Sequence, residues 1–344
     1  MKLIKRVYKW MILSIILQIL VLAYFNYDFL LKDHDIKATS YEIDDETINK
    51  KKKSIEIKQG ATQLNVSHDG YHAAWLLQGK VHVYDLTNKK LIDTIEDELG
   101  DINYYRWLPD RNIIIYSISI HQAGKVNVMT KDIDTGNIHS YPAISGLAKN
   151  SEVKHIELSP LTNVVYVKIQ TSSTKARIYK YDIMDNLSYI MLFESSSKIR
   201  EANLSDKLFY EDENGRIMQW DGRRKSKSRI DISGKTSLIG VDAEDNLYIG
   251  KRDAEGKINK LLNKKQDGES NSKWNEIDLK TPCDENDIIV RMNGEVYLVN
   301  RSGKVVVNLK DNTEIKYYGE FVEILDNYIV YSKDEELIVD RINK

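Results

Sequence analysis

The feature of this sequence that most constrains its fold is a phrase that occurs seven times, in which a polar turn is followed directly by a short apolar strand. The turn at residues 67–70 reads Ser-His-Asp-Gly and precedes a strand at 71–77. The centres of the seven strands are Trp75, Tyr116, Val165, Phe209, Tyr248, Val296 and Val330. They lie 34 to 49 residues apart. A period in the forties, with about four strands in each unit, is typical of β-propeller blades.

A second phrase follows the first in several units and indicates hairpins. Residues 81–88 lead into a strand at 91–95, and residues 126–136 lead into a strand at 138–141. The Asp, Asn and Gly residues of these turns accept the positive φ angles of tight hairpins. The Ser-x-Asp-Gly turn, the apolar strand and the Tyr-Asp-x-x-Thr-Gly hairpin together resemble the TolB-like and WD40-like propeller superfamily over roughly residues 54–344. The resemblance implies an all-β propeller, a fold that serves many functions.

The number of blades depends on how the ring closes. The last unit has room for three strands, at 317–325, 328–332 and 337–342. Residues 54–58, before the first full blade, alternate as a strand would. If this strand joined the last blade, the ring would close and two exposed sheet edges would disappear. We therefore expect a seven-bladed β-propeller at 54–344, closed by that strand, with six or eight blades as alternatives.

An apolar segment precedes the propeller. Residues 1–9 form a basic tail with Lys2, Lys5, Arg6 and Lys9, and residues 10–31 are predominantly apolar. A helix over 10–31 would be about 33 Å long, which is enough to cross a membrane. Positive charges before the helix predict a cytoplasmic N-terminus and a propeller outside the cell. We thus expect a single-pass signal-anchor, with residues 32–53 as a polar linker.

A cleaved signal peptide is the alternative for this segment. Residues 21–23 read Val-Leu-Ala, which suits signal peptidase cleavage near Ala23. The next residues, 24–29, are aromatic and apolar, an unusual start for a mature chain. This favours the uncleaved anchor in the cell membrane over a secreted protein.

Charge and motifs exclude several function classes. The chain has 50 basic and 52 acidic side chains, so there is no bulk attraction to nucleic acid. Cys283 is the single cysteine, which excludes disulfides within the chain and cysteine-based zinc sites. The Gly-x-Ser-x-Gly, His-Glu-x-x-His and phosphate-loop motifs are absent. Faint calcium-loop patterns at 132–136 and 211–215 fall where hairpin turns are expected. We expect no catalytic residue, cofactor or metal ligand.

The candidate contact residues for a ligand or partner are aromatic or basic. They are Tyr104, Tyr105, Arg106, Trp107, His121, Arg223, Arg224, Lys225 and Trp274. Aromatic side chains beside polar ones suit carbohydrate or peptide binding, and the basic run at 223–225 suits a polyanion. The alternatives are that residues 104–107 form the innermost strand of the second blade, and that His121 and the basic run are solvated loops.

Together these features predict a membrane-anchored, extracytoplasmic propeller. Its expected role is that of a non-catalytic binding or scaffold subunit in the cell envelope, which docks a protein partner or an envelope polysaccharide. One alternative is a glycan-active lyase or hydrolase with carboxylates around the propeller channel. Another is a ligand sensor that works through a membrane partner.

Overall fold

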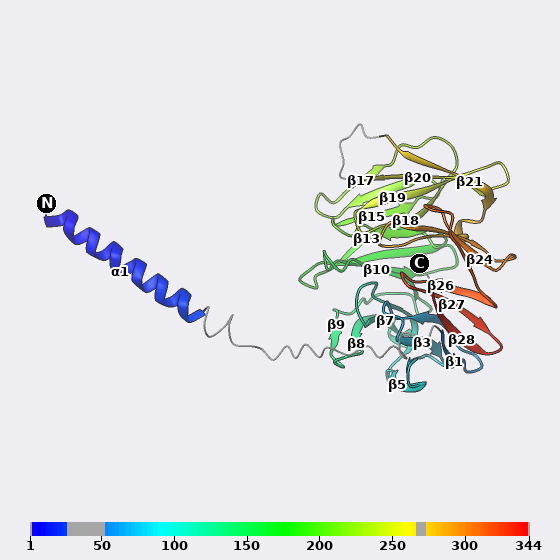
Figure 1. Ribbon diagram of the computed structural model, residues 1–344, viewed down its shortest axis with the longest axis horizontal. Helices are drawn as coiled ribbons and strands as arrows, with labels where there is room; N and C mark the ends of the chain where they lie inside the picture. Colours follow the sequence, from blue (N-terminus) through cyan, green and yellow to red (C-terminus); the bar gives the residue numbers. More distant parts are fainter. Residues whose placement is uncertain (1, 26–51, 266–272, 343–344) are drawn as a thin grey trace. The chain divides into compact units, whose positions relative to one another are not determined.

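The computed structural model describes residues 2–25, 52–265 and 273–342 (Figure 1). The chain divides into a unit of residues 1–50 and a unit of residues 51–344. In the first unit, helix α1 spans Lys2–Phe25.

Helix α1 does not provide the expected membrane span. Across the described residues, none of the helices combines the length and the apolar character that crossing a membrane requires. The first turns of α1 contain the basic residues of the tail, which shortens its apolar part. Residues 26–31, the end of the expected span, lie outside the described residues, as does nearly all of the linker expected at 32–53.

The second unit is a seven-bladed β-propeller, in which each blade is a four-stranded antiparallel sheet. Blade 1 consists of β2 (Thr62–Val66), β3 (His72–Leu77), β4 (Lys80–Asp85) and β5 (Lys90–Ile95). Blade 2 consists of β6 (Asp101–Trp107), β7 (Ile113–Ile120), β8 (Lys125–Asp132) and β9 (Ile138–Ser140), with the 3₁₀ turn η2 (His121–Ala123) after β7. Blade 3 consists of β10 (Glu152–Leu158), β11 (Val165–Gln170), β12 (Lys175–Tyr181) and β13 (Leu187–Glu194).

The later blades repeat this order, and in blades 4 and 6 the first strand has only three residues. Blade 4 consists of β14 (Ile199–Glu201), β15 (Lys207–Glu211), β16 (Ile217–Asp221) and β17 (Ser226–Arg229). Blade 5 consists of β18 (Thr236–Val241), β19 (Asn246–Arg252), β20 (Ile258–Lys265) and β21 (Asn275–Cys283), and the 3₁₀ turn η3 (Glu285–Asp287) follows it. Blade 6 consists of β22 (Ile288–Val290), β23 (Val296–Asn300), β24 (Val305–Asn308) and β25 (Glu314–Lys316).

Blade 7 joins the two ends of the propeller. It consists of β26 (Glu320–Ile324), β27 (Tyr328–Lys333), β28 (Glu336–Arg341) and β1 (Lys52–Glu56). Strand β1 pairs antiparallel with β28, with Ser54 opposite Ile338. The ring is therefore held closed by a sheet to which both ends of the propeller contribute, and the seven blades expected from the turn repeats are confirmed.

The hydrophobic core lies between adjacent blades. One cluster combines Trp75 and Tyr84 of blade 1 with Val330 and Val339 of blade 7. The ring planes of Trp75 and Tyr84 stack with centroids 4.3 Å apart. Each blade is covered on both faces by its neighbours, so its inner strands are apolar on both sides and read as continuous apolar runs. Strand β7, Ile-Ile-Ile-Tyr-Ser-Ile-Ser-Ile, shows this pattern, with six central residues fully buried.

Candidate functional site

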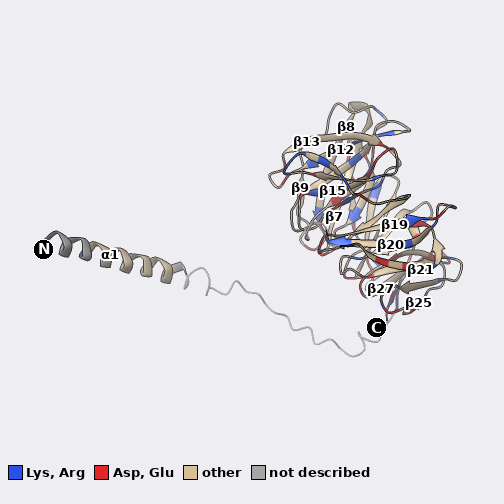
Figure 2. Ribbon diagram, turned by 90° about the horizontal axis from the view of Figure 1, so that it is seen from above, with Lys and Arg blue, Asp and Glu red and all other residues tan. Residues whose placement is uncertain are grey.

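The first strands of the seven blades surround a central cavity of about 920 Å³. Every one of these strands contributes lining residues, and neighbouring first strands touch one another around most of the ring. Basic and acidic residues are spread over all parts of the propeller (Figure 2). The cavity differs because charged side chains from several blades meet there, among them Arg106 and Arg200, which are 29% and 32% exposed, and Glu157, which is 12% exposed.

Register shifts recur in the strands that line the cavity. Strands β2, β6, β10, β18 and β26 each contain one where they pair with the second strand of their blade. A bulge bends a strand and redirects its side chains. In β10 the shift lies between Val153 and His155, and in β26 it lies between Phe321 and Glu323. Both His155 and Glu323 line the cavity.

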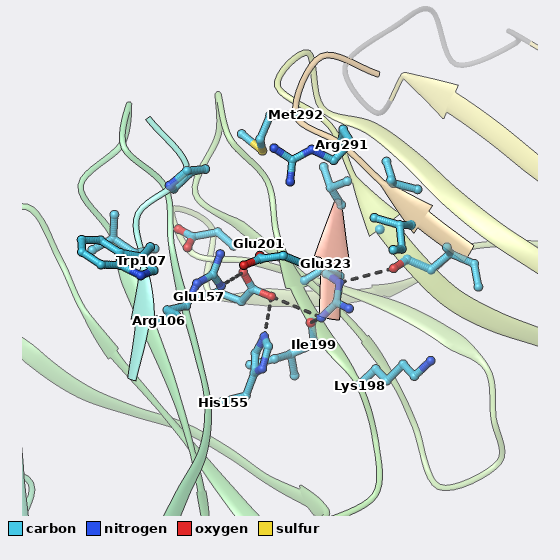
Figure 3. A pocket seen from close by; sticks show the side chains of 18 of the residues that line it. Arg106, Trp107, His155, Glu157, Lys198, Ile199, Glu201, Arg291, Met292 and Glu323 are labelled. Carbon is cyan, nitrogen blue, oxygen red and sulfur yellow. Dashed lines mark hydrogen bonds and ion pairs between the residues drawn. The ribbon is translucent and has the colours of Figure 1, made fainter. Parts of the chain in front are cut away.

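Glu157 of β10 is the centre of a charged cluster that joins three blades (Figure 3). Its Oε2 accepts a hydrogen bond from Nη1 of Arg106, on β6, at 3.1 Å. Its Oε1 lies 2.7 Å from Nε2 of His155 and 3.3 Å from Nη1 of Arg200, on β14. Burial opposes ionisation of Glu157, but His155 and the two guanidinium groups outweigh it and hold the pKa of Glu157 well below its usual range.

His155 and the two arginines are oriented by further contacts. Burial lowers the pKa of His155 despite its contact with Glu157, so the imidazole is neutral at pH 7. Nη1 of Arg106 also donates to the carbonyl oxygen of Ile156 at 3.0 Å. Arg200 donates from Nη1 to the carbonyl oxygen of Ile199 at 2.8 Å. The cluster therefore has two fixed cations and one fixed anion.

Glu201, two residues after Ile199 on β14, behaves differently. Its exposed fraction is 8%, and neither carboxyl oxygen has a hydrogen-bond partner among the described residues. Burial, together with the negative charges of Glu157 and Asp206, raises the pKa of Glu201 well above its usual value. These surroundings favour the neutral, protonated form of the carboxyl group, whose O–H group then has no acceptor among the described residues.

Two more ionisable groups line the cavity, the half-buried Glu323 and the buried Lys168. Glu323 of β26 accepts a hydrogen bond from the backbone N–H of Val66 at 2.6 Å, and burial raises the pKa of Glu323 to about 7. Nζ of Lys168, on β11, donates to the carbonyl oxygen of Ser197 at 2.6 Å, and burial lowers the pKa of Lys168 to about 8. The cavity thus holds groups whose charge changes near neutral pH.

The aromatic run expected to bind a ligand lies at this cavity. Residues 104–107 belong to β6, the innermost strand of blade 2, as one of the two sequence interpretations proposed, and Tyr104, Tyr105, Arg106 and Trp107 are all among the lining residues. The hydroxyl of Tyr105 donates to the carbonyl oxygen of Ala74 at 2.6 Å, which ties blade 2 to blade 1. Arg106 is the member of the run that enters the charged cluster.

The other candidate contact residues lie elsewhere. His121 is exposed in η2, with Nδ1 3.0 Å from the carbonyl oxygen of Lys149. Arg223, Arg224 and Lys225 are exposed in the turn between β16 and β17. Trp274, next to β21, packs against the core cluster that blades 4 and 5 share. None of them lines the cavity, and their contact with a partner stays a prediction.

The faint calcium loops are hairpin turns held by a carboxylate. Oδ1 of Asp132 accepts hydrogen bonds from the backbone N–H groups of Asp134 and Thr135 at 2.9 and 3.0 Å. Asp212 does the same for Asn214 and Arg216, at 2.9 Å each. These carboxylates stabilise turns, as Asp does in Asx-turns.

Sequence reasoning missed the residues that make the cluster. These residues lie in the first strands of blades 3 and 4, directly before a turn: His155 and Glu157 in the seven-residue β10, and Arg200 and Glu201 in the three-residue β14. A signal was present, because a charged residue inside an innermost strand is unusual where the neighbouring positions are apolar. The sequence could not show which of these charged residues meet, because the contacts join different blades. Arg200 and Arg106 lie 43 and 51 residues from Glu157 in sequence.

Comparisons with known proteins support the fold alone. No protein-family model and no curated protein matches the sequence. Among solved structures, the chain is similar to the β-propeller domain of Cps50 (Swd1) from Myceliophteria thermophila, with 12% identity and a TM-score of 0.55 over 84% of this chain and 100% of that one. It is also similar to the β-propeller domain of the Trilobed protease from Pyrococcus furiosus, with 14% identity and a TM-score of 0.51 over 79% and 88% of the two chains. That domain is described as having an open velcro topology, whereas here β1 and β28 close the ring.

A third similar structure comes from a study of two prolyl endopeptidases. Identity is 13% and the TM-score is 0.51, over 76% of this chain. The match spans 42% of the endopeptidase chain, less than half of its length. The Cps50 (Swd1) propeller and protease propellers are therefore all structural neighbours, and this likeness shows the fold without indicating a function.

Proposed function

We propose that this protein is a non-catalytic binding propeller that holds a ligand, or a segment of a protein or polysaccharide partner, in its central cavity. The observation that carries the proposal is the unused hydrogen-bonding capacity of the cavity wall. Within the described residues, Nη2 of Arg106 and Nη2 of Arg200 have no hydrogen-bond partner, and neither has the Glu201 carboxyl group. Of these groups the Glu201 carboxyl is buried, and a buried polar group without a partner is costly, so a ligand that satisfies it offsets that cost. The two arginine side chains are 29% and 32% exposed, so their free amino groups are accessible to a ligand.

The state of the cluster supports binding over catalysis. Glu157 is held as a carboxylate by three partners, which makes it a weak base. Among the described residues, the hydrogen bond of the His155 side chain goes to Glu157, so no hydroxyl or thiol group is activated by this imidazole.

Co-purification with matched variants tests this function. The tagged full-length protein would be isolated in detergent, and whatever accompanies it would be identified by mass spectrometry. Arg106→Gln removes a charged side chain from the cavity wall. The control, Arg111→Gln, removes an exposed arginine that pairs with the preceding residue, Asp110. We expect a stoichiometric ligand or partner with the native protein and Arg111→Gln, and its loss from Arg106→Gln. Retention by a correctly folded Arg106→Gln protein would contradict a role for the cavity.

A second candidate is a glycan-active enzyme, which one observation favours. Glu157 and Glu201 line the same cavity, and their environments move their pKa values in opposite directions. Such a pair is the arrangement that glycosidases use for general acid and base or nucleophile. Turnover of a glycan panel by the native protein, abolished by Glu201→Gln, would favour this enzyme; the binding proposal expects no turnover at all.

We also propose that the N-terminal segment attaches the propeller to the cell membrane, with the propeller outside. Support comes from the basic residues at the start of the chain and from apolar side chains of α1 such as Trp10, Leu17 and Leu22, which are well exposed. Membrane fractionation and protease accessibility of intact cells test this location. Release without detergent, with a new N-terminus near residue 24, would instead support the secreted alternative.

A further inference from the structure

We propose that the ligand group bound in the central cavity is a carboxylate, held by Arg106 and Arg200, with Glu201 as an additional hydrogen-bond donor. This inference rests on the proposed binding function and names the chemistry of that site. It follows from the donors that remain free in the cavity, from the charge of the cluster and from the position of Glu201.

The free donors belong to two guanidinium groups that share one carboxylate. Arg106 uses Nη1 for Glu157 and for the carbonyl oxygen of Ile156. Arg200 uses Nη1 for Glu157 and the carbonyl oxygen of Ile199, and Nε for the carbonyl oxygen of Ile239, at 3.4 Å. In the described part of the chain, each arginine therefore retains an unpaired Nη2 amino group, which can donate one charge-assisted hydrogen bond to a carboxylate oxygen.

The charge of the cluster favours an anion with a single charge. Arg106 and Arg200 contribute two positive charges, Glu157 contributes one negative charge, and His155 is neutral. One positive charge is left over on the two guanidinium groups, whose side chains are 29% and 32% exposed at the cavity. A carboxylate balances it. A phosphate dianion would overcompensate and would meet the repulsion of Glu157.

Glu201 adds a donor at the same place. Its side chain is more than nine-tenths buried, and Figure 3 shows it beside Glu157 and Arg106 in the cavity wall. The charged or titratable groups that face it are Glu157, Asp206, Arg106, Lys180 and, through Asp206, Tyr166. Lys180 and Tyr166 are both bound to Asp206, so they do not satisfy Glu201. A carboxylate ligand would accept the Glu201 proton in a charge-assisted hydrogen bond, the stronger kind.

Calorimetric titration of the full-length protein with acetate is the decisive test, because acetate consists of the proposed carboxylate and a single methyl group. The titration would be run at pH 7 and constant ionic strength, with inorganic phosphate as the second probe. We expect acetate to bind with a Kd in the millimolar range, and phosphate at least tenfold more weakly. Absence of acetate binding, or tighter binding of phosphate, would overturn the proposal.

Variants locate the bound acetate. Arg106→Gln and Arg200→Gln should each weaken acetate binding about tenfold, whereas Arg111→Gln, on the exposed surface, should leave it unchanged. Glu201→Gln keeps a donor at position 201 and Glu201→Met removes it, so the Gln variant should bind at least fivefold more tightly than the Met variant. Circular dichroism of each variant establishes folding. Equal affinity of the two Glu201 variants would exclude the donor role of Glu201.

Two further probes distinguish the source of the carboxylate. Glucuronate, with glucose as its uncharged counterpart, represents a sugar acid. Acetyl-glutamate amide, with the glutamine equivalent, represents a peptide side chain. Tighter binding of either acid than of its neutral counterpart supports the carboxylate and identifies its source, and equal binding of acid and neutral counterpart in both pairs counts against it. If no acid binds but a partner still co-purifies through the cavity, the carboxylate proposal fails while the binding function stands.

Discussion

The hairpin turns and the central cavity satisfy their carboxylates in opposite ways. In the turns, Asp85, Asp132, Asp182 and Asp212 accept hydrogen bonds from backbone N–H groups two to four residues further along the chain. In the cavity, partners also come from other blades: besides His155 on its own strand, Glu157 is bound by arginines 43 and 51 residues away in sequence.

This difference distinguishes carboxylates that stabilise a local turn from carboxylates that meet their partners only in the folded ring. A turn carboxylate is satisfied by its own hairpin and occurs again in other blades, so each one contributes modestly and independently. The cavity carboxylates are coupled to each other and, in Glu201, left without a partner among the described residues. Buried polar groups that lack hydrogen-bond partners indicate a binding site in which a ligand provides those partners.

The largest effect should come from removing the charge of Glu157. Glu157→Gln leaves Arg106 and Arg200 facing each other without their shared carboxylate. We expect a loss of about 2 kcal/mol in the free energy of unfolding, less than for a fully buried ion pair because the two arginines are 29% and 32% exposed. Urea denaturation measures it, with Asp132→Asn in a turn as the matched control. A loss no greater than that of the control would remove the distinction between the two regions.

Glu323 should make stability fall as the pH rises through neutrality. Burial raises its pKa from 4.5 to about 7, so between these values the folded protein holds a proton that the unfolded chain has released. The free energy of unfolding therefore decreases from pH 4.5 to pH 7, by about 2 kcal/mol through this group. In Glu323→Gln this contribution is absent, so the variant should be more stable than the native protein at pH 8 and nearly equal at pH 5. Parallel pH profiles of the two proteins would contradict the uncharged state of Glu323.

The same comparison explains what could be read from the sequence. Turns are local, so their Asp, Asn and Gly residues repeat visibly along the chain, and they correctly predicted the seven blades. The aromatic run at 104–107 was interpretable as an innermost strand because it alternates before a turn. The three-residue strands β14 and β22 are too short to show a period. The cluster around Glu157 requires the closed ring and the bulges of the inner strands, neither of which a local pattern specifies.

A smaller effect is expected at a single turn. Oδ1 of Asp182 accepts hydrogen bonds from the backbone N–H groups of Met184 and Asn186 at 2.9 and 3.0 Å. Asp182→Ala removes these acceptors, which should lower the free energy of unfolding by about 1 kcal/mol. Urea denaturation measures the loss, and Asp182→Asn, which retains an acceptor oxygen, should recover most of it. A loss as large as that of Glu157→Gln would show that turns are as strongly coupled as the cavity.

The smallest effect is expected at the exposed basic turn between β16 and β17. The side chains of Arg223, Arg224 and Lys225 are exposed, and the contact of Arg224 with Asp221 is long, at 3.9 Å. Surface ion pairs of this kind contribute little, so Arg224→Gln should change the free energy of unfolding by less than about 0.5 kcal/mol. Acetate affinity should also stay the same, because the turn does not line the cavity. Titration of this variant beside Arg200→Gln compares two arginines of blade 4, one on the surface of the propeller and one in the central cavity. Equal losses of affinity would show that overall positive charge, and not the geometry of the cavity, attracts the anion.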